Sequence, residues 1–196
     1  MTATLHHVPF SRSFRILWLL EELGIETQVV SYDIRDGSLR QGGFPEKSPA
    51  ARVPALEIDG RTLFESGAIV EYLWETRAEA GMGRAPGDPE RADFLQWIHY
   101  AETMAGLVEQ LNLNRVFLRD PATASAVVIK ITTARLRGTL AGMEARLGAD
   151  GWLLEGFSGA DIMMGFNLFA APYYVKLDPF PRLLARRSNS SEATCR

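Results

Sequence analysis

The chain has 196 residues, of which 46% are hydrophobic and 23% charged, as in ordinary globular proteins. Its formal net charge of −3 provides no basic field for nucleic acid, and its longest apolar run, residues 16–20, is too short to cross a bilayer. The N-terminus carries no charged-then-apolar leader, so we expect a cytoplasmic protein with no nucleic-acid or membrane partner.

The cysteine and histidine content argues against redox and metal chemistry. A single cysteine, Cys195, excludes an intrachain disulfide and a Cys-x-x-Cys pair. His6 and His7 are adjacent in a predicted strand and therefore point to opposite faces, while His99 is far away in the sequence. We expect no metal site.

The first third of the chain predicts two strands separated by a helix. Residues 3–8 form the first strand, and apolar residues at helical spacing predict a helix from Ser13 that ends at Gly24. Residues 26–34, rich in β-branched side chains, form the second strand. Residues 35–51 contain several glycines and prolines, which predict a loop with at most a short irregular helix.

A hairpin is the strongest local signal that follows. Asp59-Gly60 separates the apolar runs PALEI and RTLF, which is typical of a type I′ turn between antiparallel strands. Ser66 is then predicted to cap a helix whose apolar residues repeat at helical spacing over 69–74. The two earlier strands are joined through a helix, so we expect them to be parallel.

A change in composition divides the chain into two predicted domains. Residues 79–88 are rich in glycine and proline without periodicity and predict a linker. We expect an α/β domain over residues 1–78 and, because no convincing strand follows the linker, an all-helical domain over residues 89–196. Its helices are predicted over 89–113 and 122–147, from about Ser158, and after Pro181.

The helix start at Ser158 has a structural explanation. Asp161 follows three residues later, which is the aspartate version of a capping box. We therefore expect this helix start to serve folding rather than chemistry.

Pro54 is unexpected directly before a predicted strand, because proline cannot donate a hydrogen bond to a sheet. The order of elements, with a proline in the loop before the hairpin, is that of a thioredoxin-like domain. We therefore expect a cis Val53–Pro54 bond that presents the Val53 backbone to an extended, peptide-like ligand. A plain trans turn is the alternative.

The pair Glu65-Ser66 lies at a predicted helix N-terminus. Free N–H groups and a serine hydroxyl suit a carboxylate, and the Glu65 carboxylate suits an ammonium group. Together they could bind the ammonium and carboxylate groups of a free α-amino acid. Taken alone, the pair would more often be a surface acid and an ordinary cap.

Three motifs in order give a family resemblance. PAARVPAL resembles P-x-x-x-V-P-x-L, ESGAIVEYL resembles E-S-x-A-I-x-x-Y-L, and SGADI resembles the helix-capping motif of the second domain of glutathione S-transferases. The resemblance extends to about residue 187 and points to a serine-type, bacterial-like cytosolic member. It implies a thioredoxin-like glutathione-binding domain followed by an all-α domain.

The resemblance implies a site for glutathione, γ-Glu-Cys-Gly, as co-substrate. Glu65 and Ser66 would hold the γ-glutamyl ammonium and carboxylate, and Val53 would pair with the cysteinyl backbone. Arg52 would reach the glycyl carboxylate, with Arg40 as the weaker candidate for that role.

A group that activates the thiol is also expected. A free thiol has a pKa near 8.5 and is mostly protonated at pH 7. The first strand lacks a tyrosine, and PFSRSFR resembles the serine-type S-x-x-x-R, here Ser11 and Arg15. We predict that Ser11 is the catalytic donor to the sulfur. Ser13 is the competing donor, and the third possibility is that both serines are only caps.

The implied activity is conjugation of the glutathione thiolate to a small hydrophobic electrophile, a detoxification reaction, by a cytosolic homodimer. The alternatives are another glutathione-dependent enzyme (dehalogenase, ether-cleaving enzyme, isomerase or peroxidase) or a non-catalytic binding protein. The electrophile would contact the loop near Phe10 and a helix carrying Trp97, Tyr100 and Met104, although their spacing is also that of a helical core. The tail after Arg187 departs from the family pattern.

Overall fold

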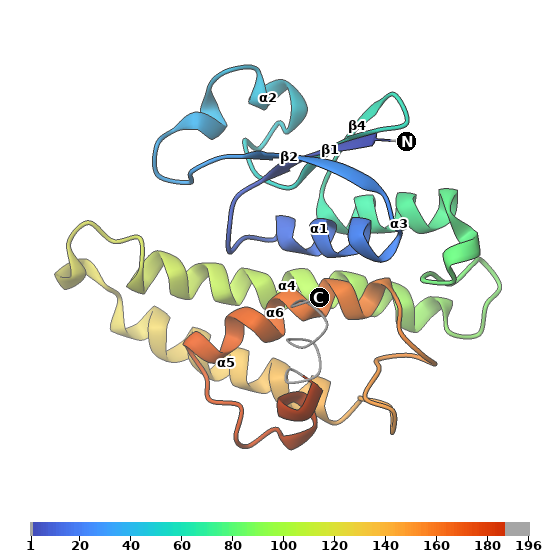
Figure 1. Ribbon diagram of the computed structural model, residues 1–196. Helices are drawn as coiled ribbons and strands as arrows, with labels where there is room; N and C mark the ends of the chain where they lie inside the picture. The colour runs from blue at the N-terminus through green and yellow to red at the C-terminus, as the bar shows by residue number, and fades with distance from the viewer. Residues whose placement is uncertain (1, 187–196) are drawn as a thin grey trace. The chain divides into compact units, whose positions relative to one another are not determined.

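The structure, a computed structural model, describes residues 2–186 (Figure 1). The chain forms two compact units, Met1–Asp88 and Pro89–Arg196, and each is described here by itself. Cys195 and the whole tail after Arg187 lie outside the described residues. Within them, no helix combines the length and the apolar character that crossing a membrane requires.

The N-terminal unit is built on a four-stranded mixed sheet in the order β2-β1-β3-β4. As predicted, β1 and β2 are parallel and the β3–β4 hairpin is antiparallel. Strand β3 also pairs antiparallel with β1. The elements are β1 (Thr2–His7), α1 (Ser13–Glu22), β2 (Glu26–Ser31), η1 (Ser38–Arg40), α2 (Phe44–Lys47), β3 (Ala55–Ile58), β4 (Arg61–Phe64), α3 (Ser66–Thr76) and η2 (Ala78–Ala80).

The two faces of this sheet are covered differently. Helices α1 and α3 lie on one face and the short α2 lies on the other (Figure 1). Leu5 in β1 is fully buried and pairs with Leu56 in β3, so these strands form the centre of the core. Side chains alternate along β1, so His6 contacts the ring of Phe44 at the start of α2, whereas His7 lies on the α1 side.

The short turns in this unit have the backbone conformations predicted from their residues. Asp59 and Gly60 have φ values of 54° and 71°, as a type I′ turn requires at both central positions. Helix α1 ends before Gly24, whose φ of 61° is the left-handed conformation that glycine adopts without strain. Residues 35–51 were predicted to form a loop with at most a short irregular helix; the structure has two short helices there, η1 and α2.

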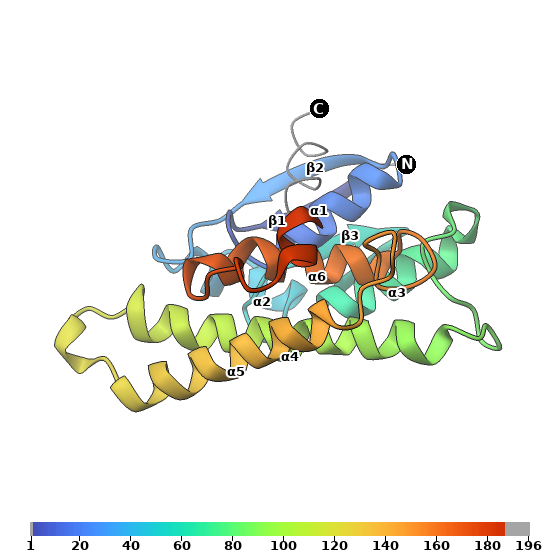
Figure 2. The same cartoon turned by 90° about the horizontal axis from the view of Figure 1, so that it is seen from below.

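The C-terminal unit is helical, and α4 packs against both α5 and α6 (Figure 2). Met104, Leu140 and Met164, one from each helix, are fully buried and form part of its core. The elements are α4 (Arg91–Arg115), η3 (Pro121–Thr123), α5 (Ala126–Glu144), α6 (Gly159–Ala170) and η4 (Ala171–Tyr173), followed by helical residues 181–186.

Helix α6 begins with the predicted capping box. The Asp161 carboxylate accepts the backbone N–H of Ser158 at 2.8 Å and the Ser158 hydroxyl at 2.9 Å. It also accepts a hydrogen bond from the Arg186 guanidinium at 2.6 Å, an ion pair whose acidic side chain is fully buried. Side chains of the same unit therefore satisfy this helix start.

Candidate functional site

The start of α3 differs from the prediction. Ser66 is the first helical residue rather than the cap, and Glu65 occupies the N-cap position with φ 68° and ψ 113°. Among the described residues, no side chain caps this end. The Ser66 hydroxyl instead accepts a hydrogen bond from Arg15 Nη1 at 2.9 Å. The first N–H groups of α3 therefore remain available to an anion.

The backbone conformation of Glu65 indicates that the start of α3 is a ligand-binding site. A positive φ is uncommon for a residue other than glycine, and such conformations cluster at ligand-binding sites. Glu65 is exposed, so its carboxylate faces solvent beside the uncapped helix end. An acceptor for a cation thus lies directly next to a site for an anion.

Arg15 is a buried cation under the same helix end. Its side chain is fully buried, although it lies on a helix whose other inward residues are mostly apolar. Burying a guanidinium is costly unless hydrogen bonds hold it, and Ser66 supplies one of them. The spacing of Arg15 and Leu19 on one face of α1 could have predicted this burial. Arg15 and the α3 dipole both place positive potential at the Ser66 hydroxyl.

The loop before β3 has the predicted backbone conformation, because the Val53–Pro54 peptide bond is cis. In the β3–β4 hairpin, Ala55 pairs with Phe64. One further step in this antiparallel register places Pro54 and Val53 at the same end of the hairpin as Glu65 and Ser66.

The β1–α1 loop reaches this same end of the sheet. His6 pairs with Ala55, so the chain that leaves β1 after His7 emerges beside the chain that enters β3. The Arg15–Ser66 hydrogen bond then ties the start of α1 to the start of α3. Ser11, which lies between β1 and α1, therefore belongs to the same edge of the N-terminal unit.

The two serines of this loop have different environments. Ser13 is fully buried, whereas Ser11 is partly exposed and its Oγ lies 2.7 Å from Ser13 Oγ. Arg12 is the N-cap residue of α1 and its side chain does not cap the helix, whereas the Ser11 hydroxyl accepts the backbone N–H of Ser13, the first helical residue, at 3.3 Å. Only Ser11 presents its hydroxyl where a ligand could contact it.

The two candidate arginines are both exposed and lie in the loops before β3. The backbone N–H of Arg52 donates to the buried Ser48 hydroxyl at 3.3 Å, which anchors the residue directly before Val53. Arg40 ends the short helix η1, 12 positions earlier in the sequence. Arg52 is therefore the arginine adjacent in the chain to the edge described above.

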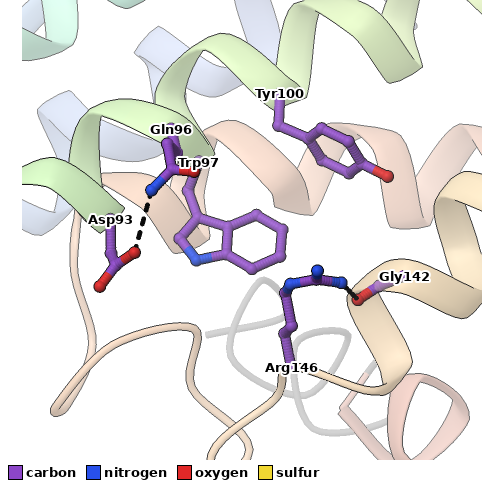
Figure 3. A pocket seen from close by; sticks show the side chains of 6 residues that line it. All are labelled: Asp93, Gln96, Trp97, Tyr100, Gly142 and Arg146. Carbon is purple, nitrogen blue, oxygen red and sulfur yellow. Dashed lines mark hydrogen bonds between the residues drawn. The ribbon is translucent and has the colours of Figure 1, made fainter.

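A cavity of about 280 Å³ lies within the C-terminal unit, between α4 and α5 (Figure 3). The Trp97 and Tyr100 rings meet edge to face at 5.6 Å, and the Tyr100 hydroxyl donates to the Thr139 carbonyl at 3.3 Å. Burial raises the pKa of the Tyr100 phenol. The remaining lining residues are Asp93, Gln96, Gly142 and Arg146.

The three candidates predicted on α4, Trp97, Tyr100 and Met104, are therefore divided. Met104 is fully buried and belongs to the helical core, as its spacing allowed. Tyr100 lines the cavity, and Trp97 is buried and lines the cavity as well. Sequence spacing placed all three on one side of the helix but could not separate the core residue from the residues that line the cavity.

Comparison with known proteins decides the family. Residues 1–75 match the family described as "Glutathione S-transferase, N-terminal domain". The chain is 30% identical to "Glutathione S-transferase 1" of Saccharomyces cerevisiae in an alignment of 197 positions that covers 85% of this chain and 82% of the yeast protein. The chain belongs to the glutathione S-transferase family.

One further relative and one solved structure are also similar to the chain. The chain is 28% identical to "Glutathione S-transferase 3" of Schizosaccharomyces pombe, over 91% of its own length and 78% of that protein. The solved structure of a sphingomonad glutathione S-transferase in complex with glutathione superposes with a TM-score of 0.81 at 23% identity, covering 96% of this chain and 92% of that one. The fold is thus the glutathione S-transferase architecture, a thioredoxin-like domain followed by a helical one.

Proposed function

We propose that this protein is a glutathione transferase that conjugates the glutathione thiolate to a small hydrophobic electrophile. The observation that carries the proposal is the uncapped start of α3, where the Ser66 hydroxyl is backed by the buried Arg15 guanidinium and flanked by the exposed Glu65 carboxylate. A zwitterionic amino-acid head has the complementary charges.

The γ-glutamyl group of glutathione fits this corner. Its carboxylate accepts hydrogen bonds from Ser66 and the first N–H groups of α3, and its ammonium donates to Glu65. The Val53 backbone, beside the cis proline, pairs with the cysteinyl residue as an added strand does. Arg52 takes the glycyl carboxylate, and Arg40 is the alternative for that contact.

Ser11 is the proposed catalytic residue. Its partly exposed hydroxyl donates to the sulfur and stabilises the thiolate, with help from the α1 dipole. A pKa two units below that of the free thiol corresponds to about 2.7 kcal/mol, which is within the range of a charge-assisted hydrogen bond plus that dipole.

The test combines calorimetry with rates on a generic electrophile. Wild type should bind glutathione and S-methylglutathione comparably, because the proposed anchors contact the backbone and termini. Ser11→Ala should retain affinity, but its rate at neutral pH should fall about ten- to a thousandfold, and higher pH should restore much of that loss. Ser38→Ala, which removes a hydroxyl at the start of the short helix η1, is the matched control.

Three outcomes separate the proposed function from its rivals. Absence of glutathione binding by wild type contradicts the proposal altogether. Binding without turnover on a panel of electrophiles favours a binding protein on this fold. Turnover confined to dehalogenation, ether cleavage, isomerisation or peroxide reduction would assign one of the related glutathione-dependent reactions.

We further propose that the protein acts as a cytosolic homodimer, with the family as the basis for this assignment. Two-fold homodimers are also the commonest closed assembly of soluble proteins. Analytical ultracentrifugation at micromolar concentration should show a single species of twice the chain mass of 21.7 kDa. A monomer under those conditions would contradict the assignment.

A further inference from the structure

A row of three side chains leads inward from Ser11. Ser11 Oγ lies 2.7 Å from Ser13 Oγ, and Ser13 Oγ lies 2.8 Å from His7 Nδ1. His7 is the last residue of β1 and Ser13 is the first residue of α1, so the rigid ends of two elements hold the inner part of the row. Ser13 is fully buried and His7 is partly buried.

The hydrogen-bonding capacity of Ser13 limits how this row can be arranged. A serine hydroxyl has one proton and two lone pairs. The Val8 backbone N–H donates to Ser13 Oγ at 3.2 Å and takes one lone pair. One proton and one lone pair remain for Ser11, for His7 and for the more distant Val8 carbonyl at 3.3 Å.

If His7 Nδ1 is an acceptor, it takes the Ser13 proton. Ser13 then has only a lone pair for Ser11, so Ser11 must donate its own proton inward. A Ser11 hydroxyl in this arrangement cannot donate to a sulfur at the same time.

If His7 Nδ1 carries the proton, the row runs in the opposite direction. His7 donates to Ser13, and Ser13 donates to Ser11. The Ser13 backbone N–H also donates to Ser11 Oγ at 3.3 Å, so both lone pairs of Ser11 are then occupied. The Ser11 proton is left as its one remaining hydrogen-bonding group, and it points away from the row.

We propose that His7 is a positioning residue for catalysis: its Nδ1–H donates to Ser13 and thereby directs the Ser11 proton toward the glutathione thiolate. This inference rests on the proposed function and adds a residue that acts through Ser13. Successive hydrogen bonds in one direction also polarise one another, which makes the terminal hydroxyl a better donor.

The charge of His7 fits this role. Burial lowers the pKa of the His7 imidazole, so the ring is neutral at neutral pH and its single N–H is assigned to one nitrogen or the other. The Nδ1–H tautomer supplies the donor without placing a second charge behind the serines.

The first experiment determines that tautomer by ¹⁵N NMR of the histidine rings in the glutathione complex. The chain contains only three histidines, so the His7 signals can be assigned by their loss in His7→Asn. We expect the shifts and couplings of an Nδ1–H imidazole for His7. An Nε2–H imidazole in the complex would overturn the proposal.

The second experiment measures the pKa of bound glutathione by thiolate absorbance in three variants. His7→Leu, which lacks any donor, should raise that pKa by about one unit and lower the rate at neutral pH about tenfold, with affinity within about threefold of wild type. His7→Asn retains an N–H near the Nδ1 position and should recover much of the loss. His99→Leu, at an exposed position of α4, should match wild type.

The outcomes keep the two proposals distinguishable. A His7→Leu protein with the wild-type pKa of bound thiol overturns the positioning role and leaves the transferase function in place. A wild-type protein that does not bind glutathione overturns the function itself. If His7→Leu does not fold, the tautomer in the wild-type complex decides the question.

Discussion

Two helix starts in this protein look alike in sequence and differ in structure. Helices α3 and α6 each begin beside a serine, and both serines were predicted to be caps. At α6, Ser158 and Asp161 form a fully buried capping box that Arg186 completes. At α3, Ser66 accepts from Arg15, and no described side chain caps the helix.

The start of α6 therefore serves folding, whereas the start of α3 is suited to binding a ligand. Orphan N–H groups at a helix start are satisfied by side chains, water or ligands. The α6 start uses side chains of its own unit, so it has little left to offer a ligand. The α3 start combines positive potential with an exposed carboxylate, and these charges complement those of a zwitterion.

The largest effect should come from breaking the α6 start. Asp161→Ala removes one partner of a buried ion pair together with the capping box, so the free energy of unfolding should fall by about 3–5 kcal/mol. Urea denaturation measures it. The matched control is Asp120→Ala, which removes an exposed cap of η3 and should cost about 1 kcal/mol. Equal costs would contradict the structural importance of the buried box.

Substitution at the start of α3 should lower the affinity for glutathione. Ser66→Ala removes a hydroxyl that we propose contacts the γ-glutamyl carboxylate, so glutathione binding should weaken by about 1–2 kcal/mol. The variant also removes an acceptor of Arg15, so some loss of stability is expected. Calorimetry on the folded protein measures the affinity. Unchanged affinity in Ser66→Ala would remove this residue from the site.

Glu65→Gln tests the other half of the same corner. The carboxylate is exposed, so its contact with the ligand ammonium should contribute only about 1 kcal/mol, or roughly fivefold in affinity. An analogue of glutathione that lacks the ammonium group should bind the variant and the wild type equally. If the variant weakens both ligands to the same extent, Glu65 does not contact the ammonium.

The smallest effect is expected at an ordinary cap. The Ser125 hydroxyl accepts the backbone N–H of Val128 at 3.3 Å at the exposed start of α5. Ser125→Ala should lower the free energy of unfolding by about 0.5–1 kcal/mol and leave glutathione affinity unchanged. Thermal unfolding measures the change in stability and calorimetry the change in glutathione affinity. Together they allow the effect of losing an ordinary cap to be compared with the effects at Ser66 and Ser158.

Local features of the fold could be predicted because their causes lie within a few residues. The Asp59-Gly60 turn requires positive φ values that these two residues tolerate, and the α6 box needs only Ser158 and Asp161 three positions apart. The parallel pairing of β1 and β2 follows from the intervening helix.

The errors and omissions concern contacts between distant residues. Ser66 looked like a cap because the local sequence favours one, and only the burial of Arg15, 51 positions earlier, changes its role. The His7–Ser13 contact was missed for a similar reason, since it depends on how α1 packs against β1. The propensities of single residues contain no information on such pairings.

One measurement tests the binding role of the α3 start most directly: backbone amide chemical shifts recorded by NMR during titration with glutathione. The amides of residues 67–69, in the first turn of α3, should shift with saturation, and those of residues 160–162, in the first turn of α6, should not. Saturating shifts at 160–162 with none at 67–69 would contradict the account.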